Sequence, residues 1–101
     1  MVEIEIDIVR PVNPTGVSFI KYLYGAVASR NKKVIDNYKK EFTKLATRFG
    51  YRIEEEIGTN KLITGKIVLE VEDDGKPIKM YTDRLEIWDK IKEINEKIEL
   101  S

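Results

Sequence analysis

The 101-residue sequence contains no cysteine, no histidine and no glutamine. Without cysteine the chain has no disulfide, no thiolate metal ligand and no thiol nucleophile. Without histidine it also lacks the commonest general base and the commonest metal ligand. These absences exclude most catalytic designs and leave carboxylates, lysines, tyrosines and hydroxyl groups as the available chemistry.

Long hydrophobic runs are also missing. The most apolar stretch covers residues 17–28, about 12 positions, and Lys21 interrupts it, whereas a membrane-spanning helix needs about 20. The first ten residues alternate acidic and apolar side chains, which is unlike a signal peptide. We therefore expect a cytoplasmic protein with no membrane partner.

Hydrophobic residues make up 42% of the chain and charged residues 36%, with no net charge. This apolar content supports one folded domain over residues 1–101 and argues against disorder. Abundant Lys, Glu and Ile, together with few thermolabile residues, are typical of heat-adapted proteins.

Hydrophobic spacing divides the first half of the chain into one strand and two helices. Alternation predicts a half-buried strand over residues 2–8. Asn13 followed by Pro14 predicts the start of a helix that continues to Gly25 or Ser29. Apolar residues three and four apart predict a second helix over residues 31–49, with Gly50 just past its end. The sequence leaves open whether the two helices are separate or one bent helix.

The second half predicts three strands and a final helix. Strands are expected over residues 51–57, 61–72 and 76–81, with a hairpin turn at residues 73–75. Asp83 and Glu86 resemble a capping box before an apolar helical stripe: Ile87, Trp88, Ile91, Ile94 and Ile98. The expected fold class is α+β in the order β-α-α-β-β-β-α, an antiparallel sheet of about four strands with helices packed on one face.

Positive charge is concentrated in one segment. Residues 30–48 contain seven basic and two acidic residues, although the whole chain is neutral. On a helix, five of these basic residues fall on one stripe opposite the apolar face: Arg30, Lys33, Lys40, Lys44 and Arg48. Such a stripe can follow a phosphate backbone, so nucleic-acid binding is the alternative function. A solvated face in a charge-rich protein is the simpler explanation. Tyr38 and Tyr51 are expected in the core.

The first predicted helix is apolar nearly all round, which is unusual in so short a chain. A partner surface would cover the part that the chain itself leaves exposed, and a homodimer is the commonest arrangement. The expected interface residues are Phe19, Ile20, Leu23, Tyr24 and Val27. The sequence therefore favours a non-catalytic interaction module that self-associates or docks into a larger intracellular complex.

Carboxylates provide the third hypothesis, an acid–base enzyme. Alternation in a strand over residues 51–57 would place Glu55 on the same face as Ile53, and an inward carboxylate could act as a base. A bulge or an edge strand would instead leave Glu55 structural. Asp73 and Asp74 could help bind a hard cation, but a turn explains them. We expect no catalytic residue, no metal site and no cofactor.

Overall fold

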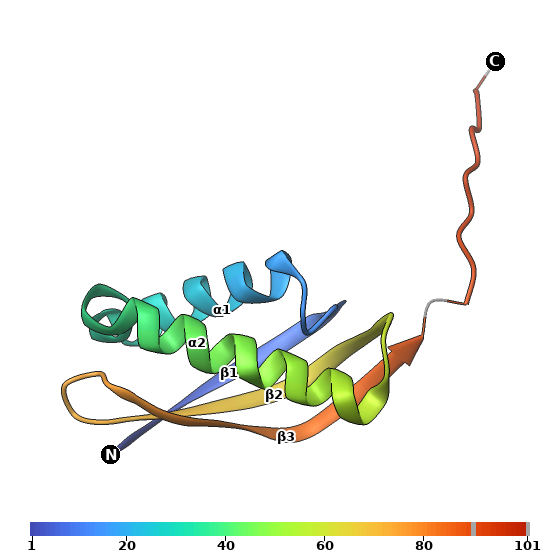
Figure 1. Cartoon of the computed structure of the whole chain (residues 1–101). Helices are drawn as coiled ribbons and strands as arrows, with labels where there is room; N and C mark the ends of the chain where they lie inside the picture. The colour runs from blue at the N-terminus through green and yellow to red at the C-terminus, as the bar shows by residue number, and fades with distance from the viewer. Residues whose placement is uncertain (90, 101) are drawn as a thin grey trace.

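The computed structural model describes residues 1–89 and 91–100. It contains a three-stranded antiparallel sheet and two helices. Along the chain these are β1 (Val2–Val12), α1 (Val17–Arg30), α2 (Lys32–Ile57), β2 (Lys61–Val71) and β3 (Pro77–Asp89). The sheet order is β1-β2-β3, so β2 is central. Both helices lie on the same face of the sheet (Figure 1).

The core lies between this sheet face and the two helices. The inward side chains of β1 are Ile4, Ile6 and Ile8, as the alternation predicted. Phe19 from α1 and Phe42 from α2 are fully buried against them. The remaining core residues come mainly from the inward face of β2 and from the apolar stripes of the helices: Leu23, Val27, Val34, Ala46, Phe49, Ile63, Ile67, Leu69 and Val71.

The helix boundaries are set by asparagines, although not in the predicted way at the first helix. Asn13 accepts a hydrogen bond from the Thr15 backbone N–H at 3.0 Å, within a turn, and α1 begins only at Val17. Asn31 separates α1 from α2 and caps α2 by accepting from the Lys33 backbone N–H at 3.2 Å. The two helices are therefore separate.

The predicted strand over residues 51–57 is wrong, because α2 continues to Ile57. Phe49, Ile53 and Ile57 recur every four residues and pack on the core, so they extend the helical stripe. Ile53 and Ile57 would also share one face of an extended strand with Tyr51, so the pattern is compatible with a strand as well. Three consecutive glutamates between them are good helix formers and favour the longer helix.

Gly50 lies inside α2 and does not end it. The helix ends instead at Gly58, whose φ of 91° is in the region that favours glycine. The Gly58 backbone N–H donates to the Glu54 carbonyl at 2.8 Å. The predicted type of helix end is therefore found eight residues later than expected.

The predicted final helix from Asp83 is also wrong. Residues 83–89 belong to β3, which pairs with β2 along nearly its whole length. Residues 91–100 have no regular secondary structure. A helix beginning at Asp83 would leave residues 61–66 of β2 without backbone partners on that side, and unpaired groups in a central strand are costly. The fold is thus α+β with three strands and two helices, without the fourth strand and the last helix.

The hairpin turn between β2 and β3 is confirmed. Gly75 has a φ of 98°, and its N–H donates to the Glu72 carbonyl at 2.9 Å. Further along the hairpin the pairing shifts between Thr64 and Lys66, opposite Arg84, whose φ is 54°. This irregularity has the form of a β-bulge, within which Leu85 packs against the core.

Candidate functional surfaces

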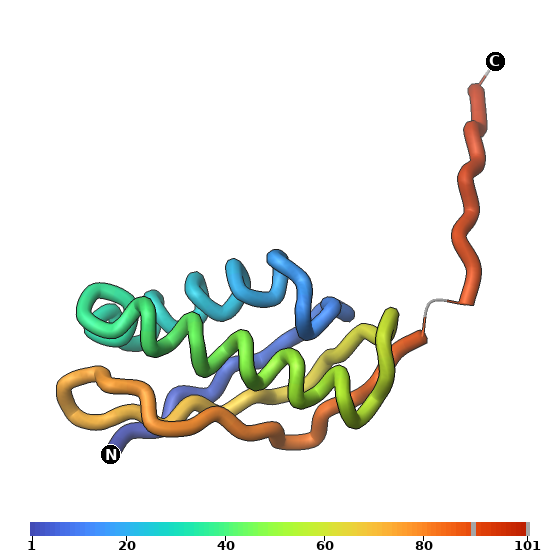
Figure 2. The backbone as a smooth tube through the Cα atoms, in the orientation of Figure 1, coloured from blue at the N-terminus to red at the C-terminus, as the bar shows by residue number. Residues whose placement is uncertain are grey.

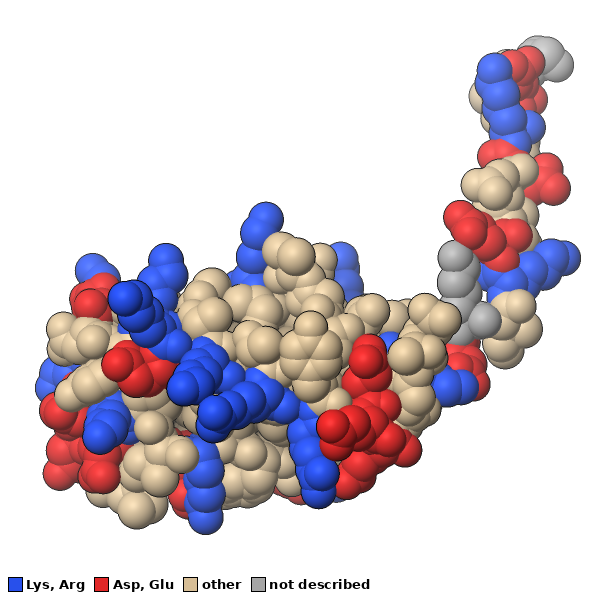
Figure 3. Space-filling model, in the orientation of Figure 1, with Lys and Arg blue, Asp and Glu red and all other residues tan. Residues whose placement is uncertain are grey.

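α2 presents a row of basic side chains on the side turned away from the sheet. Lys33, Lys40, Lys44 and Arg48 are all exposed. Tyr38 has non-helical φ and ψ angles of −133° and 31° and kinks the helix between Lys33 and the other three. Beyond the kink the three follow one another every four residues on one face. Figure 3 shows this row across α2, and acidic side chains gathered where the helix ends.

The three cations of the row beyond the kink have no acidic partners. Within the described residues, no carboxylate oxygen lies within 4.0 Å, the limit for an ion pair, of the charged nitrogens of Lys40, Lys44 or Arg48. On the open face of the sheet, by contrast, Lys66 pairs with Glu5 at 3.4 Å and Lys79 pairs with Glu70 at 3.3 Å. α2 therefore carries a continuous row of cations that is not neutralised within the described residues, unlike these two lysines of the sheet.

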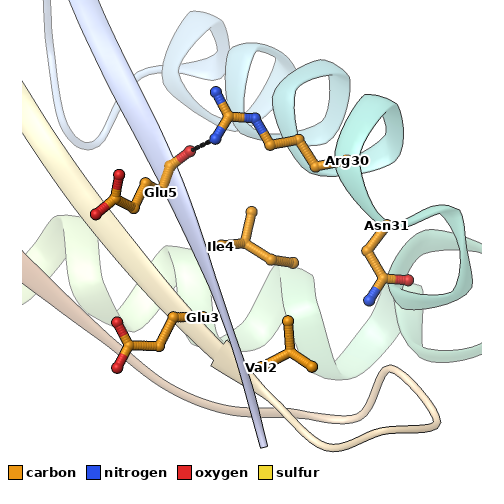
Figure 4. A pocket seen from close by; sticks show the side chains of 6 residues that line it. All are labelled: Val2, Glu3, Ile4, Glu5, Arg30 and Asn31. Atoms are coloured by element: carbon orange, nitrogen blue, oxygen red, sulfur yellow. Dashed lines mark hydrogen bonds between the residues drawn. The ribbon is translucent and has the colours of Figure 1, made fainter.

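Arg30 does not belong to this row. It ends α1, and its guanidinium donates a hydrogen bond to the Glu5 carbonyl of β1. Figure 4 shows Arg30 and Asn31 on one side of β1, with the Glu3 and Glu5 carboxylates directed to the other side. These residues line a shallow pocket of about 360 Å³ together with Val2 and Ile4. Arg30 thus holds α1 against β1.

Tyr51 is a surface residue that the sequence assigned to the core. Its side chain is 57% exposed. It follows Arg48 by three residues and Thr47 by four on the outward side of α2, so it continues the basic row. The signal was present in the sequence: Tyr51 lies off the stripe of Phe49 and Ile53 once residues 51–57 are taken as helix.

The structure places the five predicted interface residues mostly in the core. Phe19, Leu23 and Val27 are fully buried within this chain. Ile20 and Tyr24 are partly buried and pack on the same core. The Tyr24 ring lies 5.6 Å from the Phe42 ring, and its hydroxyl is hydrogen-bonded to Thr43 of α2. Tyr24 therefore joins the two helices, and self-association through α1 stays a prediction.

Exposed apolar side chains gather instead at the end of the chain. Within residues 91–100, Ile91 is 96%, Ile98 is 92% and Leu100 is fully exposed, and Ile94 is 67% exposed. The tube in Figure 2 shows this segment leading away from the helices and the sheet. The nearby Trp88 is 47% exposed although its indole N–H donates to the Thr64 hydroxyl at 2.7 Å.

The carboxylates do not form a buried site. Glu55 is on α2, 69% exposed and 3.4 Å from the Arg52 guanidinium, so the buried setting that the acid–base hypothesis required is missing. Asp74 accepts from the Tyr38 hydroxyl at 2.5 Å and from the Lys76 backbone N–H at 3.1 Å, which holds the hairpin turn. Among residues 1–89 and 91–100 no group of three or more potential carboxylate ligands could hold a metal ion.

The hydrogen bond between Tyr38 and Asp74 affects both groups. Donation from the Tyr38 hydroxyl lowers the pKa of Asp74, and the Lys76 backbone N–H lowers it further. Acceptance by Asp74 raises the pKa of Tyr38. Both groups are solvated, so this link positions α2 against the hairpin and does not create a reactive acid or base.

Comparison with protein-family models, with curated proteins and with solved structures gives no match for this chain. Neither helix, over the residues that the structure describes, has the length and apolar content needed to cross a membrane.

Proposed function

We propose that the protein is a non-catalytic interaction module that self-associates, and that the apolar side chains of residues 87–100 form the contact surface. The observation that supports this proposal is the near-complete exposure of Ile91, Ile98 and Leu100. Monomeric proteins rarely leave such apolar side chains together in water without a partner. Ile87 and Trp88, at 46% and 47% exposure, extend the surface onto the end of β3.

The charges of this segment favour a second copy as the partner. Residues 91–100 contain two lysines and three glutamates. Two copies therefore bring charges of both signs together, and there is little net repulsion to overcome. An isologous contact of this kind needs no other protein and closes after two chains.

The outer edge of β1 is unsuited to the same role. Side chains of α1 already bond the carbonyl groups along it: Arg30 donates to Glu5 and Tyr22 donates to Asp7. These side chains cover that part of the edge and obstruct the approach of another strand, and covering is a common way to prevent edge-to-edge association. This contact favours an interface made by side chains at the other end of the sheet.

Sedimentation of the full chain at micromolar concentration tests the proposal. The protein should have a mass above the 11.8 kDa of one chain. The triple variant Ile91→Ser/Ile94→Ser/Ile98→Ser should sediment as a monomer with an unchanged circular dichroism spectrum. The control Lys92→Ser/Glu96→Ser alters the same segment without changing net charge or apolar content, and it should associate like the wild type.

A further variant locates the contact. Val17, 71% exposed on α1, allows Val17→Glu to place a charge on that helix without entering the core. If Val17→Glu dissociates the protein and the triple serine variant does not, the contact lies on α1. A wild-type chain that stays monomeric throughout would remove self-association altogether.

A further inference from the structure

The outward face of α2 carries a row of cations that contacts within the chain do not explain. It is the second such surface, after the exposed apolar side chains of the chain end. Lys40, Lys44 and Arg48 stand on one helical face with no ion-pair partner in the described part of the chain. The lysines of the open sheet face are paired. Because the chain as a whole is neutral, this row is a local positive surface and not a reflection of overall charge.

We infer that this face, formed by Lys40, Lys44, Arg48 and Tyr51, binds single-stranded nucleic acid. This inference goes beyond the proposed self-association and uses a different surface. The regular spacing of the three cations along α2 suits a linear polyanion lying along the helix, whose condensed counterions they would release. Tyr51 supplies an exposed ring at the end of the row on which a base can stack.

The single-stranded form is favoured over a duplex by two observations. Tyr51 is 57% exposed, and its ring offers a stacking surface that bases already stacked in a duplex cannot use. α2 also packs on the sheet, with α1 beside its first part, so it does not project as a free recognition helix (Figure 1). A single strand whose phosphates lie along the row and one of whose bases stacks on Tyr51 is consistent with both observations.

Acidic residues mark where the proposed site ends. Glu54, Glu55 and Glu56 follow Tyr51 in the last turns of α2, and acidic side chains gather there in Figure 3. Glu55 lies four residues after Tyr51 on the same face and pairs with Arg52 at 3.4 Å. A phosphate next to Tyr51 would meet this carboxylate, so Glu55 should weaken binding at this end.

Fluorescence anisotropy with labelled oligo-dT and oligo-U strands tests the inference. Lys40→Ala/Lys44→Ala/Arg48→Ala should weaken binding by about tenfold or more at low salt and reduce the slope of log affinity against log salt by about 2. The control Lys21→Ala/Lys76→Ala/Lys79→Ala removes equal charge from exposed sites outside both proposed surfaces and should retain affinity and slope. Equal losses from both variants would show nonspecific attraction and overturn the site.

Variants at the end of the row test the role of the ring. Tyr51→Ala should weaken binding by roughly 5- to 100-fold without changing the salt slope, and Tyr51→Phe should bind like the wild type. Glu55→Gln should bind more tightly, a gain that loss of folding cannot produce. If Tyr51→Ala leaves the affinity unchanged, the inference of a single-strand site is overturned. It is also overturned if heparin or duplex DNA binds as tightly as oligo-dT and oligo-U.

The two proposals fail separately. The basic-row variant should keep the sedimentation behaviour of the wild type, because its side chains lie on α2 and not in residues 87–100. The triple serine variant should conversely keep the affinity of each chain for a short strand that accommodates one protein. Loss of strand binding in the serine variant would contradict a site contained within α2.

Discussion

Gly25 and Gly50 both lie inside helices, but they have different surroundings at the level of single atoms. A Cβ atom added at Gly25 in α1 would have nothing within 4 Å. A Cβ atom at Gly50 in α2 would lie 2.1 Å from the Pro14 carbonyl oxygen. Gly50 therefore allows the loop before α1 to approach the α2 backbone, which explains why a glycine stands inside this helix.

The same substitution should have opposite effects at these two positions. Gly25→Ala should stabilise the protein by about 0.5–1 kcal/mol, because alanine loses less backbone entropy in a helix. Gly50→Ala should destabilise it by roughly 1–3 kcal/mol despite the same propensity gain, because the methyl group overlaps the backbone of Pro14. Urea unfolding of the two variants measures both values, and stabilisation by both would mean that the loop does not pack there.

The Tyr38–Asp74 hydrogen bond gives a pH dependence whose sign can be derived. The pKa of Asp74 is lowered in the folded protein from 3.8, so its contribution is present above that pH and lost as the pH falls through the lowered value. The pKa of Tyr38 is raised from 10.0, so its contribution is present below that pH and lost as the pH rises through the raised value.

Tyr38→Phe should therefore lower the melting temperature at neutral pH, and the difference from the wild type should shrink in both strong acid and strong alkali. Asp74→Asn should remove most of the effect of Tyr38→Phe, because the two groups share one bond. Tyr51→Phe is the control, since this exposed tyrosine makes no hydrogen bond to the described residues. A Tyr38→Phe difference that is constant with pH would contradict the assignment.

At the scale of elements, the sequence predicted those features whose signals are local and unopposed. The alternation of β1, the Gly75 turn and the exposed spacing of Lys40, Lys44 and Arg48 belong to this class. Residues 51–57 fit both periods, and only the packing of Ile53 and Ile57 on the sheet decides between them. At Asp83 the sequence has a good helix-capping pattern, but these residues form β3 and pair with β2. This pairing depends on residues about 20 positions earlier in the chain, which a local pattern does not include.

The candidate site shows the same limits. Helical spacing places Arg30 on the basic stripe only if it is continued back across residue 31, and the break at Asn31 directs its side chain to β1. Tyr51 was missed because its position on a strand or a helix decides whether it faces inward. Spacing therefore identified the cations within one regular helix, whereas residues at the boundaries required the tertiary structure.

Residues 91–100 are exposed and do not form the predicted helix, so Ile91 should contribute little to stability. Ile91 is 96% exposed and Ile67 of β2 is fully buried, so the same truncation should separate them clearly. Ile67→Ala should cost roughly 2–5 kcal/mol through lost burial and a cavity. Ile91→Ala should change the stability of the single chain by about 0.5 kcal/mol or less. Chemical unfolding at low protein concentration provides the comparison, and a large loss for Ile91→Ala would mean that residue 91 packs on the domain.

For the whole molecule, three surfaces have distinct character. The open face of the sheet is largely neutralised by its own pairs, such as Lys66 with Glu5. The outward side of α2 is positive and unpaired, and residues 91–100 are exposed and rich in isoleucine. Because the second and third surfaces are separate, one chain can join a second copy while α2 stays accessible.

The proposed self-association would couple folding to association. A contact formed only by the folded chain stabilises it by mass action, so the melting temperature should depend on protein concentration. Each tenfold rise in wild-type concentration should raise the melting temperature by a few degrees in the range where association occurs.

The triple variant Ile91→Ser/Ile94→Ser/Ile98→Ser should have a melting temperature that is independent of concentration. At the lowest concentrations it should match the wild type, because those side chains make little contact with their own domain. A variant that melts lower than the wild type at every concentration, with parallel curves, would place the three isoleucines in the fold of one chain. Differential scanning calorimetry across a dilution series distinguishes the two outcomes without any assumption about the shape of the complex.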